Sequence, residues 1–493
     1  MTAHRMFSRP ARAGALGLAL ASALPLAVAL TPGAARASGL DAPQVGPGTS
    51  GATVPDAAAV FWNPAALAFV ERPQLLLGAG LVLGRVTYQR DRLGTYQTPD
   101  TFQFNAPLAA EYIDPSKTGP AEEVAATPMA PFGDAFLALP INRQLVLGAG
   151  LYVPYAAALG FPEDGAQAWQ LREAFIVATF LTVSAAARLT DEVSIGAGLS
   201  YVSGLAELSK LQDFSSLGEF QRAFSNDPIN QENDFGPNAP TEVRELEVLS
   251  RPISLKRAIS HGATFNLGVS YQPSDALSLA ASYQHGARMR YVGDFSAAMN
   301  DDMFTQDVAA QGLKYKPLVK GDAELIFRLP KRITLAAAYE ASDRLALDGF
   351  VQYVTYSDID AFVVKTRSPD LAQPRLGIPD QVEVTLPRKW SDTIWLEGRA
   401  KLQLTNELLV SAAAGYQSPA SPDSTIDVAS PDGHRLIGGL GGVLEVSDAV
   451  ALSGDVRLQG ILPRTVTTSD YDLGNGTYTL FLASVAGHLR VLF

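Results

Sequence analysis

The chain has 493 residues, with 38 Lys and Arg against 50 Asp and Glu, a formal net charge of −12, and no cysteine. An acidic chain is a poor partner for nucleic acid, because affinity for DNA or RNA depends on basic groups that contact phosphates. The lack of cysteine excludes disulfides and thiolate metal sites. With 42 glycines and 47% hydrophobic residues, the composition also disfavours a disordered chain.

Residues 1–37 are predicted to be a secretory signal peptide. Three arginines precede an apolar run over residues 13–30, and the small residues Ala35 and Ala37 follow it, so cleavage is expected before Ser38. A membrane-anchoring helix is the alternative, but a proline interrupts the run. No later stretch offers the roughly 20 uninterrupted apolar residues that a spanning helix needs. Any membrane span of the exported chain would therefore consist of strands.

The next segment, residues 38–72, shows no alternation and is rich in Gly, Pro and Ala. It is too long for one strand and too apolar for a free tail, so we expect it to fill the lumen of a wide barrel as a plug. It contains the sequence Asn63-Pro64-Ala65. Local chemistry alone favours a simple helix start for this sequence, with Asn63 as the cap and Pro64 as the first helical residue.

From residue 73 to the end, apolar and polar residues alternate with period two in many segments, including 144–154, 192–201, 394–404 and 450–460. Such segments reach the roughly 9–11 residues that a tilted strand needs to cross a bilayer. Soluble sandwiches also alternate, so the pattern alone does not decide. The signal peptide and the last alternating strand, which ends the chain on Phe493, favour a transmembrane barrel of the outer membrane.

The connections between these segments alternate strictly between short and long. Six are turn-like, near residues 141–143, 190–191, 273–275, 342–343, 405–406 and 447–448. Seven are long, at about 91–130, 157–172, 207–260, 294–320, 361–390, 418–433 and 464–477. Thirteen connections predict 14 antiparallel strands, the last pairing with the first near residues 74–88. Because short turns of outer-membrane barrels are periplasmic, both termini are expected in the periplasm.

One of the predicted strands contains a possible break. Residues 321–341 include Leu329-Pro330-Lys331, and Pro330 cannot donate a ladder hydrogen bond. No turn residues surround it, and a split there would give an odd strand count. We interpret the segment as one long strand with an irregularity at the proline.

Two long connections, at about 207–260 and 294–320, show helical spacing of apolar residues and are predicted to be helical outside loops. The first contains Phe214, Phe220 and Phe224 among charged residues. Such aromatic faces either pack on each other or form a hydrophobic surface that captures a ligand, and the residues leave both readings open.

Several short motifs follow one another along the chain in a characteristic order: Asp56-Ala57-Ala58, Phe61-Trp62-Asn63-Pro64-Ala65-Ala66-Leu67, Glu71-Arg72-Pro73, Leu139-Pro140-Ile141-Asn142, Leu329-Pro330 and Ser418-Pro419. In this order they resemble the FadL/TodX family of outer-membrane transporters for long-chain fatty acids and hydrophobic compounds. The resemblance covers essentially the whole mature chain. It implies an all-β, 14-stranded transmembrane barrel over residues 73–493 with an N-terminal hatch over residues 38–72, which agrees with the strand count.

The resemblance also implies places for a ligand. The third and fourth outside loops would form a hydrophobic capture surface around the three phenylalanines named above. Phe61 and Trp62 of the hatch are expected to line a deeper site. Lys365 lies near a basic residue with which the family holds a carboxylate. A second basic cluster of the family is not reproduced, since residues 203–207 read SGLAE, so a neutral hydrophobic ligand stays open.

Four other basic residues, Arg399, Lys401, Arg457 and Arg490, point to the lumen by parity. Charged side chains are the normal lining of a barrel lumen, which favours a structural role for each of them. A ligand carboxylate is the other partner that such a residue would suit.

The family's exit is a kink in the third strand that opens the wall sideways. The sequence Pro154-Tyr155-Ala156 occupies that place and is predicted to form a lateral opening, because Pro154 cannot donate to the ladder. The alternative is a proline at the outer end of a regular strand.

No catalytic, metal or cofactor motif stands out. The five histidines are scattered, and the glycine-rich stretch 438–442 lies within an alternating strand and not at a strand-to-helix turn. The predicted function is uptake of long-chain fatty acids or other hydrophobic molecules; the alternatives are a general diffusion porin, a structural or adhesive barrel, and a barrel enzyme. Expected partners are the apolar ligand, outer-membrane lipid and lipopolysaccharide, and the barrel-assembly machinery, which reads the last strand.

Overall fold

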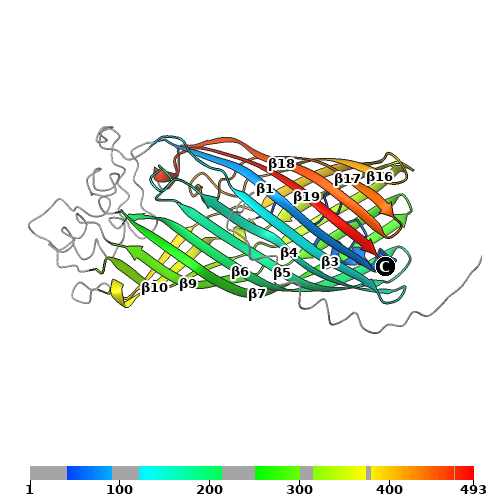
Figure 1. Ribbon diagram of the computed structural model, residues 1–493, viewed down its shortest axis with the longest axis horizontal. Coiled ribbons are helices and arrows are strands. Elements are labelled where there is room, and N and C mark those ends of the chain that lie inside the picture. The colour runs from blue at the N-terminus through cyan, green and yellow to red at the C-terminus, as the bar shows by residue number, and fades with distance from the viewer. Residues whose placement is uncertain (1–40, 92–120, 214–249, 300–314, 373–378, 471) are drawn as a thin grey trace, which may run out of the picture. The chain divides into compact units, whose positions relative to one another are not determined.

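The computed structural model describes residues 41–91, 121–213, 250–299, 315–372, 379–470 and 472–493. Its strands form one antiparallel sheet that closes into a barrel, because β1 (Gln74–Arg90) pairs with β3 (Met129–Pro140) on one side and with β19 (Gly476–Leu492) on the other. The strands run obliquely around the barrel, and the C-terminus lies at the end of the short turns (Figure 1).

The other strands follow in chain order. They are β2 (Val124–Ala126), β4 (Leu145–Gly160), β5 (Glu173–Arg188), β6 (Val193–Asp213), β7 (Ser250–Ser274), β8 (Leu277–Gln284), β9 (Arg288–Ala298), β10 (Leu318–Arg328), β11 (Arg332–Ser342), β12 (Leu345–Val354), β13 (Ala361–Arg367), β14 (Gln381–Pro387), β15 (Thr393–Gln403), β16 (Leu408–Gln417), β17 (Arg435–Ser447) and β18 (Val450–Val466).

The helices of the described residues are short. They are α1 (Ala59–Trp62) and the 3-10 helices η1 (Pro64–Phe69), η5 (Tyr356–Asp358), η6 (Pro369–Leu371) and η8 (Asp472–Gly474). None of them has the length and apolarity that would let it cross a membrane.

Five strands of the barrel are interrupted, so the 19 segments amount to 14 barrel strands. The segment pairs are β2 with β3, β8 with β9, β10 with β11, β12 with β13, and β14 with β15. The break around Pro330 is one of these interruptions. The backbone on either side of it bonds to the interrupted parts of the neighbouring strands: the Leu329 N–H donates to Ala287 O (2.8 Å), and Lys331 O accepts from the Thr355 N–H (3.0 Å). The predicted count of 14, with a proline irregularity in the eighth strand, is confirmed.

Side chains that bond to the following backbone form several of the short turns. The Asn142 Oδ1 accepts from the N–H of Leu145 (2.9 Å), and the Thr190 Oγ1 accepts from the N–H of Val193 (3.0 Å). The hydroxyl of Thr405 does the same in its turn. Local bonds of this kind let polar residues reverse the chain within a few positions.

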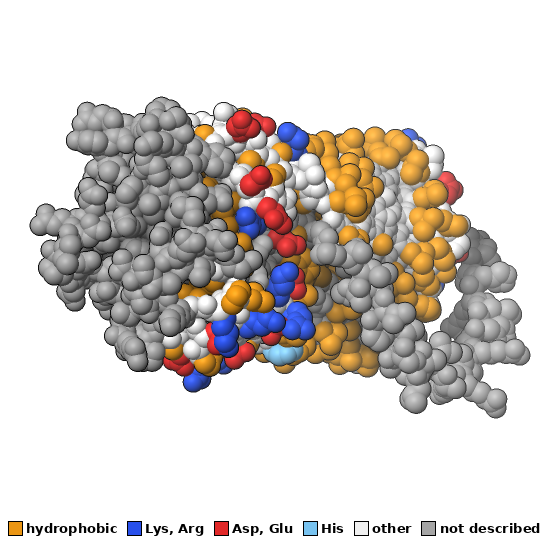
Figure 2. Space-filling view, turned by 60° about the vertical axis from the view of Figure 1, so that its left-hand side comes forward, with side chains coloured by type: hydrophobic (Ala, Val, Ile, Leu, Met, Phe, Trp, Pro, Cys, Tyr) orange, Lys and Arg blue, Asp and Glu red, His pale blue; other side chains and the backbone are white. Residues whose placement is uncertain are grey.

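The outward face of the barrel carries an apolar belt. On β15, Ile394 and Leu396 are 46% and 43% exposed, whereas Trp395 and Glu397 are only 9% and 8% exposed. The hydrophobic side chains form a band around part of the barrel, and charged side chains gather beyond its edge (Figure 2). An apolar band facing outward with polar residues inside is the pattern of a barrel in lipid.

The prediction of helical loops is wrong for both ends of each of the two long connections. Residues 207–213 and 250–260 continue β6 and β7, and residues 294–298 and 318–320 belong to β9 and β10. The stretches between these strand ends lie outside the described residues.

Continuous strand pairing, and not a helix, accounts for residues 207–213. The register of β6 with β5 runs without a shift from Ser194 to Ser209, and β6 pairs with β7 as far as Asp213. The β6–β7 register shift after Ala206 places the extra residue in β7, where Lys256 and Arg257 stand opposite a single residue of β6. Leu208 and Leu211 therefore belong to an extended strand despite their spacing of three.

Candidate functional site

Residues 41–70 lie against the inner wall of the barrel and bond to several of its strands. The Gln459 Nε2 of β18 donates to Pro43 O (3.2 Å), and the Asn266 Nδ2 of β7 donates to Val60 O (2.8 Å). The Arg399 guanidinium of β15 donates to Gly48 O. The segment therefore contacts strands that lie far apart around the barrel. We call residues 41–72 the N-terminal segment.

Asn63, Pro64 and Ala65 form the best anchored part of the N-terminal segment. The fully buried Asn63 side chain accepts from the Ala65 N–H (3.1 Å), and its Nδ2 donates to Ala52 O (2.9 Å) and to Ser270 Oγ of β7 (2.9 Å). Asn63 thus caps η1 with Pro64 as its first residue, as local chemistry predicted. The same side chain ties the helix start to the wall.

The structure brings Phe61 and Trp62 together with aromatic side chains of the wall. The Phe61 ring lies 5.0 Å from Trp62 and 5.3 Å from Tyr152 of β4, and Trp62 lies 6.0 Å from Phe350 of β12. Tyr152 in turn stacks on Phe180 of β5 at 5.8 Å. These rings form a largely buried apolar surface of the kind that lines pockets for hydrophobic ligands.

The ladder between β3 and β4 stops partway along the wall. It runs from the Pro140–Val146 pair to the Ala135–Leu151 pair. Beyond it, within the described residues, β3 pairs only with β1 and β4 only with β5 among the strands. We call residues 129–134 of β3 and 152–160 of β4 the β3–β4 gap.

Pro154 lies in this gap and inside β4, not at its outer end. The β4–β5 register shifts between Tyr152 and Tyr155, so Pro154 belongs to a bulge. The N-terminal segment touches the same place: Asp41 forms a bridge with Tyr155, and the Ala42 N–H donates to Pro154 O (2.9 Å). Pro154 and Tyr155 are buried, and Ala156 is partly exposed.

The four basic residues predicted to face the lumen do so, and each meets a carboxylate. Arg399 and Lys401 both contact Asp348, at 2.6 and 3.0 Å. Arg457 pairs with Glu397, and Arg490 with Glu445. These pairs agree with the structural role that was expected for lumenal charges.

Lys365, expected near a ligand carboxylate, lies elsewhere. Its ammonium contacts Glu383 at 2.7 Å, and both side chains are about half exposed. In β13 the apolar Phe362 and Val364 pack against the buried core, so residue parity turns Lys365 outward. Phe214, Phe220 and Phe224 lie outside the described residues.

Sequence reasoning missed the buried charges Asp41, Arg332 and Arg435. Arg332 pairs with Asp41, and both side chains are nearly inaccessible. The alternation of β11 and β17 turns both arginines inward, a signal the sequence contained. No sequence pattern pointed to Asp41, because its partner lies 291 positions away.

The outer wall below the gap carries an apolar groove of about 630 Å³, lined among others by Leu147, Val183, Leu199 and Leu267. These side chains are all more than 40% exposed, so the groove faces the lipid side and is not part of the lumen.

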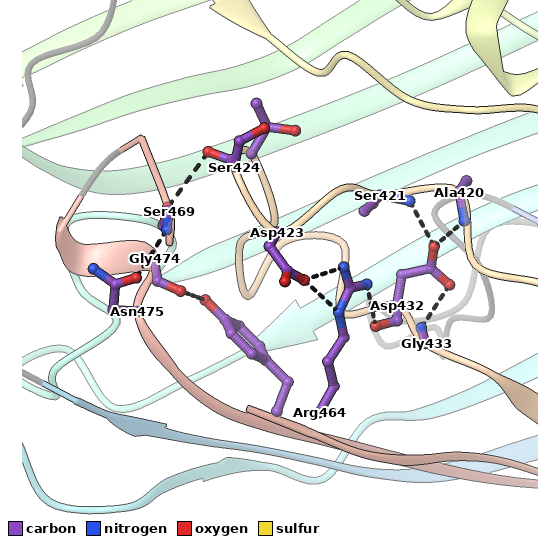
Figure 3. A network of polar contacts seen from close by, with 12 residues as sticks. Ala420, Ser421, Asp423, Ser424, Asp432, Gly433, Arg464, Ser469, Gly474 and Asn475 are labelled. Carbon is purple, nitrogen blue, oxygen red and sulfur yellow. Dashed lines mark hydrogen bonds and ion pairs between the residues drawn. The ribbon is translucent and has the colours of Figure 1, made fainter. Parts of the chain in front are cut away.

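Above the lumen, polar contacts organise the loops that follow β16 and β18. The Asp432 carboxylate accepts from the backbone N–H groups of Ser421 (2.8 Å) and Gly433 (2.9 Å), and Arg464 contacts Asp423 (Figure 3). Buried carboxylates satisfied by backbone donors fix a loop in one conformation.

Comparison with known proteins agrees with this architecture. The profile of the family described as "Outer membrane protein transport protein (OMPP1/FadL/TodX)" matches residues 18–479. Outer membrane protein P1 of Haemophilus influenzae is 22% identical over 349 residues, which are 70% of this chain and 68% of that protein.

Two solved structures show the same fold. A FadL homologue of Pseudomonas aeruginosa has a TM-score of 0.70 at 18% identity, covering 92% of this chain and 99% of that one. The toluene transporter TodX of Pseudomonas putida has a TM-score of 0.65 at 16% identity, covering 93% and 100%. With the closed 14-strand barrel and the profile match over most of its length, the chain belongs to the OMPP1/FadL/TodX family of outer-membrane transport proteins.

Proposed function

We propose that this protein takes up long-chain fatty acids or other hydrophobic molecules and releases them sideways through the β3–β4 gap. The interrupted ladder beside Pro154, Tyr155 and Ala156 carries the proposal. In a closed barrel every backbone group on the wall is paired, so a stretch without pairing is where the wall opens most readily. An apolar molecule leaving there passes from the lumen into lipid without crossing water.

The N-terminal segment acts as the hatch of this channel. Asn63, Pro64 and Ala65 anchor it to the wall, and its first residues cover the edge of β4 at the gap. Phe61 and Trp62 give the lumen an apolar surface on which a ligand binds. Movement of the hatch away from the gap opens the exit. Binding and diffusion down a gradient drive transport.

Capture takes place at the outer end of the barrel, on a hydrophobic surface that includes Phe214, Phe220 and Phe224. Ligand classes named for similar proteins support an apolar cargo: TodX is described as a toluene transporter, and another similar structure, CymD, as a monoaromatic hydrocarbon channel. Lys365 has no part in the proposed binding, because it pairs with Glu383 on the outer side.

The same proposal fixes the orientation. Both termini lie on the periplasmic side with the short turns. Outer-membrane lipid and lipopolysaccharide surround the apolar belt, and Phe493 serves recognition by the barrel-assembly machinery. We assign the protein no catalytic activity.

Mass spectrometry of lipids that copurify with the full-length protein tests the function. We expect recovery of fatty acids or hydrocarbons, and liposomes containing the protein that stay impermeable to sugars. A general diffusion porin is the competing function; it predicts no bound apolar molecule and rapid swelling in sugar solutions. That pair of results would reject the proposal.

A further inference from the structure

Two arginines face each other across the β9–β10 ladder on the outside of the barrel. Arg288 of β9 and Arg328 of β10 are direct partners in the antiparallel register. Both are exposed, whereas Met289 and Phe327 beside them in the chain are buried. The alternation therefore turns both guanidinium groups away from the lumen. Like charges directly opposite each other on a sheet are destabilising unless another group neutralises them.

No carboxylate of the described residues neutralises this arginine pair. Neither side chain forms an ion pair or a hydrogen bond within the part of the chain that the structure describes. The charge of Arg328 does act on Asp358. That carboxylate is already occupied, because the Lys331 ammonium contacts it at 3.0 Å and the Thr355 hydroxyl donates to it (2.5 Å). The donors of both guanidinium groups are therefore left for a group from outside the described chain.

Other arginines on the outside of the same strands, or of the next one, do have acidic partners. Arg290, two residues after the first arginine of the pair, contacts Glu324 at 2.5 Å. Arg367 of β13 lies 3.6 Å from Asp380. The wall thus supplies carboxylates to its outward arginines at these positions, but it supplies none to the arginine pair. This difference points to an anionic ligand and not to a general excess of positive charge.

The arginine pair lies where the apolar belt ends. On the side of the short turns, β8 and β11 present the exposed Leu279, Ile333 and Leu335. On the side of the long loops, the ion pair of Arg290 and Glu324 follows. Lys and Arg side chains and a histidine gather at the edge of the hydrophobic band in Figure 2. The head groups of membrane lipids lie at this level of a barrel, directly beyond the hydrocarbon.

An exposed histidine lies across the interruption between β8 and β9 from Arg288. The His285 Nδ1 lies 2.7 Å from the Tyr283 hydroxyl, and its ring stacks on Phe265 with the centroids 4.8 Å apart. These contacts hold the imidazole in place and use one of its two nitrogens. The other, Nε2, has no partner among the described residues. Histidine and tyrosine at this level present an apolar ring to the lipid chains and a polar atom to the head groups.

We propose that Arg288 and Arg328 together bind a phosphate group of lipopolysaccharide, with His285 as a further donor, while its acyl chains lie on the apolar belt. A phosphate has enough oxygens to accept from both guanidinium forks at once and neutralises both charges. In the proposed orientation the long loops face outside, where lipopolysaccharide carries phosphates on an acylated sugar. The inference rests on that orientation and not on transport, because the arginine pair faces lipid and not the lumen.

Binding of lipid A, the phosphorylated and acylated part of lipopolysaccharide, to the purified full-length protein in an uncharged detergent tests the site. Native mass spectrometry compares lipid A that has both phosphates with lipid A from which they have been removed. The native protein is expected to bind the phosphorylated form at least about tenfold more tightly, the size expected for charge-assisted hydrogen bonds.

Variants assign this difference to the arginine pair. Arg288→Gln combined with Arg328→Gln should remove it and leave binding of the dephosphorylated form unchanged. Arg288→Lys combined with Arg328→Lys should keep part of it, because lysine keeps the charge but lacks the planar fork. Arg367→Gln is the matched control, because Arg367 is also exposed on the wall but lies beside Asp380; it should keep the full difference.

Each variant is checked for barrel formation by its mobility on unheated gels, and the comparison of the two lipid forms in the native protein needs no variant. Equal binding of both forms by the native protein, or an unchanged difference in the double glutamine variant, would overturn the inference. Phosphatidylglycerol that binds as tightly as phosphorylated lipid A, through the same two arginines, would reject lipopolysaccharide as the occupant. None of these results bears on uptake, which the copurified lipids test separately.

Discussion

At the scale of single residues, glycines of the wall decide how closely the N-terminal segment approaches it. A Cβ on Gly196 of β6 would meet the backbone of Pro64 and Ala65 closer than atoms can approach, and one on Gly268 of β7 would meet the Asn63 side chain. Glycine permits such contact because it has no side chain to displace. The anchored part of the N-terminal segment therefore depends on the residues of the wall as much as on its own sequence.

Gly196→Ala should unseat the hatch. The added methyl group would meet backbone atoms and not a flexible side chain that could move aside. Overpacking of this kind lowers the stability of the contact by about 1–3 kcal/mol. We expect the conductance of single channels in planar bilayers to rise severalfold. Gly438→Ala is the control, because a Cβ there meets no heavy atom within 4 Å. Identical conductance of both variants and the native protein would show that the contact does not hold the hatch.

The alternation of residues along a strand correctly predicted the direction of side chains on the barrel wall, but it gave no information about side chains of the N-terminal segment. It turned Arg399 and Arg457 to the lumen, where each is buried beside a carboxylate. It could not pair Arg332 with Asp41, because the N-terminal segment has no strand period that would fix the direction of its side chains.

At the scale of elements, β4 shows how one proline changes the wall. Pro154 interrupts the β4–β5 register by a bulge, and the ladder to β3 stops three residues before it. The sequence predicted a local break. The structure adds that the break lies on the side of β3, and that Asp41 and Ala42 of the N-terminal segment bond to the free edge.

A disulfide between hatch and wall tests whether this edge must be uncovered. The chain has no cysteine, so Ala42→Cys with Pro154→Cys creates a single pair. The two positions follow from the bridge between Asp41 and Tyr155, which brings them opposite each other within reach of a disulfide. Uptake of radiolabelled hexadecanoate should fall at least about tenfold when the pair is oxidised and recover on reduction.

Pro154→Cys alone is the control for the loss of the proline, and its uptake should not respond to oxidant. If the oxidised pair transports as fast as the reduced one, the first residues of the hatch need not leave β4.

The outer ends of β6 and β7 show where sequence periodicity fails. Leu208 and Leu211 have the spacing of a helical face, but both belong to β6. Pairing of β6 with β5 and with β7 keeps this region extended. The partner strands are fixed only in the folded barrel, so the spacing within one segment does not reveal them.

At the scale of the whole molecule, the barrel closes between its first and its last strand. The register of β1 with β19 runs without interruption from the Gln74–Leu492 pair to the Arg90–Gly476 pair, as expected for a fourteenth strand that pairs with the first. The Phe493 N–H also donates to Pro73 O (2.9 Å). A closed ring leaves no unpaired edge at this seam.

A barrel of 14 strands is wide enough to conduct water if its lumen is not filled. Deletion of residues 41–72 should therefore convert the protein into an open pore, with liposomes that swell in sugar solutions and a large steady conductance. Unheated gels verify that the shortened barrel still closes. A deleted protein that remains impermeable would mean that wall side chains alone block the lumen.

The sequence by itself determined the barrel, its 14 strands and the side on which the residues of the regularly alternating segments lie, because alternation and turn residues are local properties of the chain. It also determined the cap at Asn63, for the same reason. Only the tertiary structure decided which carboxylate meets which arginine, where the ladder stops, and what covers the free edge of β4. Asp41, Tyr155 and Arg332 come from three distant parts of the chain and meet only in the folded structure. The periodic pattern of one segment contains no information about contacts with the other two.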